Sequence, residues 1–194
     1  MNSIARTLWD LLTPALKKSP PAIQTKRSRK RSIGAAKPPT VPAAPGSMQS
    51  RYDELVDEMK RIHKIRVVKW RSSTSGCAWE VSYADGTTSR LIESPYPKGP
   101  MSCAVFMHEI GHHAIGLRTY RPRCLEEFHA WRWGLDEMNA RGFNVTPSVL
   151  KRRDDALQYA VEKAIRRGLQ KLPVELVPYL PKHRQVSEAS NPSS

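Results

Sequence analysis

Two histidines and a glutamate occur at a spacing that suits hydrolytic metal chemistry. Residues 108–112 read His-Glu-Ile-Gly-His. In a helix, residues four apart lie on one face about one turn from each other, so His108 and His112 can bind a single zinc ion. Glu109 then lies beside the metal, where it can take a proton from a zinc-bound water and return it to a leaving amine. The pattern therefore predicts metal-assisted hydrolysis, with a peptide bond as the expected target.

The residues around this pentapeptide predict that it lies in a helix with a buried back. Pro100 suits the first turn of such a helix, and Gly116 suits its end. Residues with apolar or small side chains recur at helical spacing on the side opposite the histidines: Cys103, Met107, Ile110 and Ala114. We expect this side to contact the core and the histidine side to face an open cleft.

A catalytic zinc ion that keeps one water needs a third protein ligand. One known arrangement continues the motif with a glycine and a further histidine, but the required positions hold Ile115 and Arg118. The other common arrangement places an acid on a following helix. The segment 125–134, which follows Pro122, predicts that helix. Its candidate ligands are Glu126, Glu127 and His129.

The pentapeptide and the later pattern Glu-x5-aromatic-small, from Glu127 to Trp133 and Gly134, resemble the gluzincins. These are zinc metallopeptidases whose ligands are two histidines and a glutamate. More narrowly, the chain is similar to the minimal members from phages and mobile elements and to the ImmA/IrrE-type metallopeptidases, over residues 50–170. The resemblance implies that Glu127 is the third ligand. A His129 ligand would instead resemble the three-histidine arrangement of SprT-like proteins.

The segments that flank the motif predict an α+β, zincin-like fold. A capping pattern at Ser50 and an apolar stripe that includes Tyr52, Leu55, Val56, Met59 and Ile62 predict a helix over 50–64. Three segments then predict the strands of a small antiparallel sheet: 67–70, 78–83 and 88–92, the last two joined by a hairpin turn. After the motif helix and the second ligand helix, Thr146 and Pro147 predict the start of a long helix that ends near Gly168.

The resemblance also implies where a substrate would bind. In zincins, an edge strand of the sheet lines the cleft and holds the substrate extended through backbone hydrogen bonds. The segment from Arg90 to Ser94 is the candidate. Tyr120, His113, His129 and Tyr159 are candidates for a group that stabilises the oxyanion, and the pattern does not choose among them. Trp131 and Trp133 are expected in the core.

The chain of 194 residues carries a formal net charge of +14, concentrated near its start. Residues 1–47 contain nine basic residues against Asp10, which gives a net charge of +8 and leaves +6 for the remainder. Apolar spacing predicts a short amphipathic helix within 1–18, and composition predicts a disordered basic linker over 19–47. This tail could contact nucleic-acid phosphates through charge. The folded domain is expected at 48–180, followed by a disordered tail over 181–194.

The length and the interruptions of the apolar segments predict the cellular location. Asp10 and Pro14 break the first one, so we expect no signal peptide, and no apolar run approaches the roughly 20 residues of a membrane span. Cys77, Cys103 and Cys124 lack the C-x-x-C spacing and suit reduced thiols. A cytoplasmic protein is therefore expected, with organelle import as the alternative.

Two functional hypotheses follow from these patterns, and a third combines them, with the basic tail delivering a protease to protein targets on DNA. The first is a zinc-dependent metallopeptidase acting on a protein or peptide, with His108, His112 and Glu127 as ligands and Glu109 as general base and then general acid. The alternative is a nucleic-acid-associated protein of a mobile element, whose zinc site is structural or vestigial and whose basic tail carries the function. The sequence lacks a P-loop, a dinucleotide glycine fingerprint and a serine nucleophile elbow.

Overall fold

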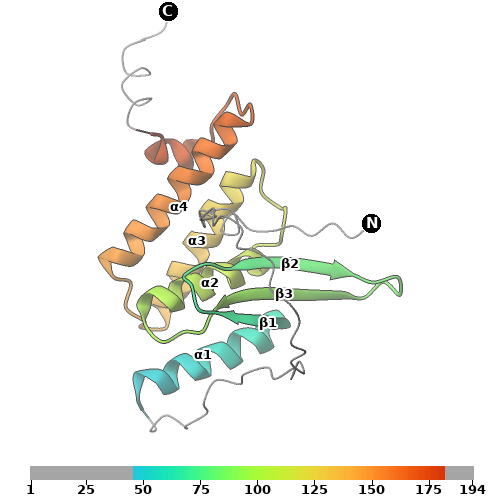
Figure 1. The fold of residues 1–194 in the computed structure, drawn as a ribbon, viewed down its shortest axis with the longest axis vertical. Coiled ribbons are helices and arrows are strands. Elements are labelled where there is room, and N and C mark those ends of the chain that lie inside the picture. The colour runs from blue at the N-terminus through green and yellow to red at the C-terminus, as the bar shows by residue number, and fades with distance from the viewer. Residues whose placement is uncertain (1–45, 182–194) are drawn as a thin grey trace, which may run out of the picture.

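A computed structural model describes residues 46–181, which form a mixed α+β arrangement (Figure 1). The elements follow in the order α1 (Met48–His63), β1 (Ile65–Arg71), β2 (Cys77–Ser82), β3 (Thr88–Pro95), α2 (Pro100–Ala114), α3 (Arg123–Ala140), α4 (Pro147–Arg166) and the 3-10 helix η2 (Val174–Tyr179). The helices and strands expected within residues 48–180 are present. The predicted N-terminal helix, almost all of the basic linker and the C-terminal tail lie outside the described residues.

The sheet is mixed, so the prediction of an antiparallel sheet is wrong for one of its three strands. The strand order is β1-β3-β2. β2 and β3 pair antiparallel from Cys77 opposite Glu93 to Ser82 opposite Thr88, as the hairpin pattern indicated. β1 instead pairs parallel with β3, from Ile65 opposite Arg90 onward. The chain passes from β1 to the far side of β3 before it forms β2, and alternating apolar residues do not reveal such a crossing.

This strand order also corrects the expected substrate-binding segment. Arg90 to Ser94 lie in β3, the central strand, whose backbone is paired with β1 on one side and β2 on the other. Figure 1 shows β3 between its two neighbours. A peptide adds only to a strand with unpaired backbone groups, so Arg90–Ser94 cannot bind a substrate in that way. The edges of the sheet are β1 and β2.

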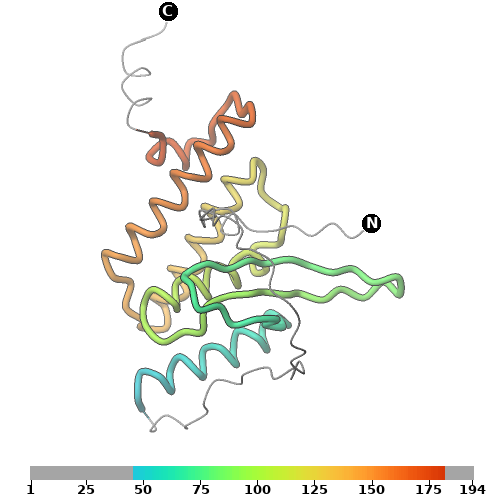
Figure 2. The backbone as a smooth tube through the Cα atoms, viewed as in Figure 1, coloured from blue at the N-terminus to red at the C-terminus, as the bar shows by residue number. Residues whose placement is uncertain are grey.

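The main core lies where α1, the sheet, α2 and α3 meet. The expected stripe of α1 is buried at Tyr52, Leu55, Val56 and Met59, whereas Ile62 near the helix end is exposed. A second, smaller apolar cluster joins α3, α4 and η2 through Cys124, Ala160, Val161, Leu176 and Leu180. Figure 2 shows α4, in orange, beside α3 and well away from α1, in cyan. α4 packs against α3 in this cluster and also reaches the main core through Val149, Ala156 and Leu157.

Local signals set both ends of α2, the helix that carries the motif. The helix begins at Pro100, and the Ser102 hydroxyl accepts hydrogen bonds from the backbone N–H groups of Lys98 at 2.9 Å and Gly99 at 3.2 Å. It ends at Ala114, and Gly116 then takes a left-handed conformation with φ of +82°. Glycine adopts this conformation without the strain that a side chain brings. The predicted start and stop are confirmed.

Within residues 46–181, no helix has both the length and the apolar character that a membrane span requires.

Candidate metal centre

α2 places the two motif histidines on one side, one turn apart, as the spacing predicts. The ring centroids of His108 and His112 are 4.7 Å apart, and their planes are inclined by 67°. Both side chains are nevertheless fully buried, as is Glu109. The expectation that this face of α2 lies open to a cleft is therefore wrong, because α3 packs directly against it.

Two glycines allow α2 and α3 to approach closely. A Cβ atom on Gly111 would lie 2.6 Å from the carbonyl oxygen of Ala130, and one on Gly134 would lie 3.0 Å from the backbone nitrogen of His108. Neither contact leaves room for a side chain, so the interface depends on glycine at both positions. Gly111 is the fourth residue of the pentapeptide, and Gly134 belongs to the aromatic-small pair on α3.

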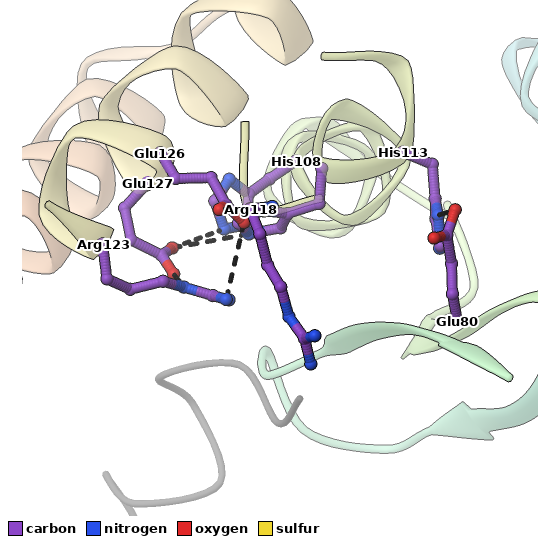
Figure 3. Close-up of polar contacts among 8 residues, drawn as sticks. Glu80, His108, His113, Arg118, Arg123, Glu126 and Glu127 are labelled. Carbon is purple, nitrogen blue, oxygen red and sulfur yellow. Dashed lines mark hydrogen bonds and ion pairs between the residues drawn. The ribbon is translucent and has the colours of Figure 1, made fainter. Parts of the chain in front are cut away.

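This close packing brings Glu127 of α3 to both histidines (Figure 3). Its Oε2 atom lies 3.4 Å from His108 Nε2 and 3.5 Å from His112 Nε2. A donor atom from each of the three residues lies within 4.8 Å of the other two. Among residues 46–181, this is the group of histidine, cysteine and acidic side chains whose geometry could hold a metal ion.

The polar atoms of this cluster lack ordinary partners. His108 Nε2, His112 Nε2 and both carboxylate oxygens of Glu109 are buried without a hydrogen bond from the described residues. Buried polar atoms almost always have hydrogen-bond partners in folded proteins, so four such atoms without partners in one place indicate a ligand-binding site. A cation bound by the two Nε2 atoms and a Glu127 oxygen would give each of these three ligand atoms a partner. Two imidazoles and a carboxylate are a donor set that suits zinc and other borderline divalent ions.

The two reserve ligands lie elsewhere. Glu126 contacts the opposite nitrogen of the His112 ring, with Oε1 3.2 Å from Nδ1, and its Oε2 accepts a hydrogen bond from the Arg118 backbone at 2.8 Å. His129 stacks on Tyr120 with ring centroids 4.0 Å apart. The structure thus brings Glu127, rather than Glu126 or His129, to the Nε2 atoms. Glu126 instead orients the His112 ring so that Nε2 points inward.

Arg123 holds the other oxygen of Glu127. Its Nε lies 3.2 Å from Glu127 Oε1, and one terminal nitrogen lies 3.5 Å from Glu126 Oε1. Because Oε1 is occupied in this way, Oε2 is the oxygen left for the histidines. This role of Arg123 was not predicted, although the spacing of four between Arg123 and Glu127 on a helix is a recognisable signal.

Trp131 packs against the ring of His108. Its ring stacks on His108 with centroids 4.4 Å apart and planes inclined by 19°. The side chain is 1% exposed, so the prediction that it belongs to the core is confirmed. Trp133 is partly buried and makes an edge contact with His63 at 5.3 Å.

The backbone immediately before β2 lies against the side chain of Glu109. A Cβ atom on Gly76 would lie 2.5 Å from Glu109 Oε1, closer than any real contact allows. The backbone just before Cys77 therefore touches the carboxylate that the motif assigns to proton transfer. Gly76 was not among the residues predicted for the site, because its signal is only a glycine directly before a strand. The segment that reaches the site thus lies immediately before the edge strand β2.

The four ionisable groups of the motif and its partner have strongly displaced pKa values. Burial lowers the pKa of His108 to about 4 and raises the pKa of Glu109 to about 8. Burial also opposes charge on His112, but the adjacent Glu127 and Glu126 carboxylates outweigh it and raise the pKa of His112 to about 9. The pKa of Glu127 falls well below its usual value, against the effect of burial, because of His112. Without metal, His112 and Glu127 therefore form a buried ion pair.

A cavity of about 550 Å³ lies next to Glu127, between the start of α3 and the end of α4. Arg123, Lys163 and Arg167 contribute its basic lining. A smaller cavity of about 250 Å³ lies beside Arg118 and also contacts Arg123.

His113, one of the oxyanion candidates, is turned away from the cluster (Figure 3). Its Nε2 atom lies 3.1 Å from the carbonyl oxygen of Leu91.

Comparison of the chain with protein-family models, with curated proteins and with solved structures finds no match. The site therefore has to be interpreted from its own geometry.

Proposed function

We propose that this protein is a zinc-dependent metallopeptidase. The observation that carries the proposal is the convergence of His108, His112 and Glu127 on one buried point, with unsatisfied donor atoms, directly beside Glu109. When bound there, zinc supplies Lewis acidity, which acidifies a water and polarises a carbonyl. The resemblance of the motif to the gluzincins is consistent with this assignment of roles.

Glu109 is the residue that moves the proton. In the metal-free fold, burial raises the pKa of this carboxyl to about 8, so the group has a higher affinity for a proton than an exposed glutamate has, as a group that takes up and returns a proton requires. It takes a proton from the attacking water and delivers it to the leaving amine. The contact between Gly76 and this carboxylate limits its movement and keeps bulk water away from one side.

The number of donors favours a catalytic over a structural site. Structural zinc sites are closed by four protein ligands, whereas catalytic sites use three and keep one position for water or substrate. Among the described residues, three side chains form the cluster. The alternative hypothesis, in which the basic tail carries the function, depends on residues 1–47, of which only Gly46 and Ser47 are described.

Replacement of Glu109 by glutamine tests the proposal. Glutamine has nearly the same shape but cannot accept the proton, so the variant should bind zinc in the same stoichiometry and lose peptide hydrolysis by at least roughly 100-fold. The measurements are zinc content by elemental analysis and cleavage of an unbiased peptide mixture followed by mass spectrometry. Glu54→Gln, on the exposed side of α1, is the matched control and should retain activity.

Equal hydrolysis by the wild-type protein and Glu109→Gln would contradict the assignment of the base. A wild-type protein that binds zinc but cleaves no peptide in the mixture would contradict the peptidase function itself.

A further inference from the structure

The cavity beside Glu127 is large enough to receive a side chain of a peptide. Its volume is about 550 Å³, within the range of about 300–1,000 Å³ that small-molecule sites occupy. The cavity shares Glu127 with the metal cluster. An occupant of this cavity therefore lies next to the group of residues proposed to cleave the substrate.

The charged residues that line this cavity are mainly cationic. Three basic side chains, Arg123, Lys163 and Arg167, face one carboxylate, that of Glu127. Arg123 already pairs with Glu127. Within residues 46–181, neither Lys163 nor Arg167 has an acidic side chain at ion-pair distance, whereas the neighbouring Arg166 pairs with Glu162 at 3.8 Å. Among the described residues, the cavity thus has two cations without an ion pair, and of the acidic groups only Glu127, already bound by Arg123, lies close enough to act on Lys163.

The helix ends at the cavity do not change this balance. The N-terminus of α3 and the C-terminus of α4 both reach it. Each helix end carries a partial charge of roughly half a unit, and the two ends have opposite signs, so their effects largely offset each other. The side chains of Lys163 and Arg167 therefore determine the sign of the potential.

The rest of the lining is apolar and small. Cys124, Ala160, Ala164 and Leu169 form this part. Such a surface suits the methylene groups of a side chain, and the cations suit a negative group at its end. A glutamate or aspartate side chain, or the carboxylate at the end of a chain, has this combination.

We infer that this cavity binds a carboxylate of the substrate peptide, so that the protein selects acidic segments. The inference rests on the proposed peptidase function and adds the class of substrate. A peptide is favoured over a nucleic acid because the cavity adjoins the cluster that would cleave a peptide bond. The second cavity extends the basic lining through Arg118 and Arg121 beyond Arg123, which favours the approach of acidic segments.

The test measures binding in a protein that cannot turn over the substrate. The probe is a short fluorescent peptide with blocked ends and one glutamate, titrated into zinc-loaded, full-length Glu109→Gln and followed by anisotropy. Two comparison peptides are titrated in the same way. One has glutamine in place of the glutamate and blocked ends, and the other has glutamine and a free C-terminal carboxylate. The variant is Lys163→Glu combined with Arg167→Glu. Arg166→Glu is the control, because it reverses one positive charge on the same helix outside the cavity.

The inference expects one carboxylate peptide, with glutamate or with a free C-terminus, to bind at least roughly tenfold more tightly than the blocked glutamine peptide. This preference should disappear in the double variant and persist in Arg166→Glu, with thermal melting confirming that both variants fold. Whichever of the two carboxylate peptides binds more tightly shows whether the cavity prefers the carboxylate of a side chain or that of a chain end.

Equal affinity for all three peptides, or a preference lost equally in Arg166→Glu, would overturn the inference. So would displacement of the peptide by a single-stranded oligonucleotide at lower concentration than by free acidic peptide, since the cavity would then belong to a nucleic-acid surface. Hydrolysis of the unbiased peptide mixture by the wild-type protein is scored separately. Cleavage without acidic preference contradicts only this inference, and absence of cleavage contradicts the proposed function.

Discussion

The two oxygens of Glu127 have different partners, and this difference determines which oxygen is available to a metal. Arg123 binds Oε1, while Oε2 lies between the Nε2 atoms of the two histidines. Glu126 acts one step further out, because it binds the Nδ1 atom of His112. Adjacent glutamates on one helix therefore have different tasks, and single substitutions should separate them.

Substitution of each candidate ligand should give a graded series of zinc affinities. Glu127→Gln should abolish stoichiometric zinc binding, because one of three donors is lost. Glu126→Gln should keep the stoichiometry but weaken binding by roughly 10–100-fold, as is usual when the partner of a ligating histidine is removed. His129→Gln should bind like the wild type. Elemental analysis after dialysis and competition with a chelating dye measure the three variants.

Full zinc occupancy in Glu127→Gln, together with loss in Glu126→Gln or His129→Gln, would reverse the assignment of the third ligand.

The packing of α2 against α3 determines whether these side chains meet at all. Gly111 contacts the backbone of Ala130, and Gly134 contacts the backbone of α2. Both contacts involve backbone atoms, which cannot swing aside as the end of a long side chain can. The distance between the two helices is therefore tightly constrained, and the position of Glu127 relative to the histidines is constrained with it.

An alanine at Gly111 should separate the helices. Its Cβ would meet the Ala130 carbonyl oxygen at 2.6 Å, so we expect a loss of roughly 1–3 kcal/mol in the free energy of unfolding, as for other overpacked sites. Zinc affinity should fall as well, because Glu127 moves away from the histidines. Denaturant unfolding and zinc titration test both effects.

Gly99→Ala, at the other end of the same helix, is the matched control. No atom lies within 4 Å of the added Cβ at that position, so the cost should be only that of a weaker helix cap. If the two variants were equally stable and bound zinc equally well, the close contact would not be what positions the ligands.

The folded region as a whole should respond to the metal, since the ligands join two helices of one core. The cluster lies between α2 and α3, and both helices contribute side chains to the main apolar cluster. A ligand that binds only the folded state stabilises it according to its free concentration. In the metal-free protein, by contrast, the site contains buried polar atoms without partners.

Removal of zinc should lower Tm by an amount that grows with pH. At a free zinc concentration about 100-fold above Kd, the stabilisation is about 2.7 kcal/mol, or roughly 5–10 °C for a domain of this size. In the metal-free fold, the pKa of His112 is raised to about 9 and that of Glu109 to about 8. Their contributions to stability are therefore present below the unfolded pKa values and are lost as pH rises through 8 to 9.

Zinc also competes with the proton of His112, so its apparent affinity should increase over the same pH range. The measurement is thermal unfolding with zinc and with a chelator between about pH 7 and pH 9. A difference in Tm that narrows as pH rises would contradict this account.

Short-range patterns in the sequence predicted the elements and part of the site. The spacing of His108 and His112, the proline at the start of α2 and the glycine after it depend only on neighbours within one or two helical turns, and the structure agrees with them. The hairpin between β2 and β3 was predicted for the same reason. Such features are encoded locally, so periodicity and turn residues reveal them.

Other features depend on residues that are distant in the sequence. The parallel pairing of β1, the central position of β3 and the burial of the histidines follow from how the chain crosses and how closely α2 and α3 pack. The spacing of residues could not decide which of Glu126, Glu127 and His129 would reach the Nε2 atoms. That choice follows from the glycine contacts and from Arg123, because a displacement of one residue along α3 turns a side chain by about 100° and points it elsewhere.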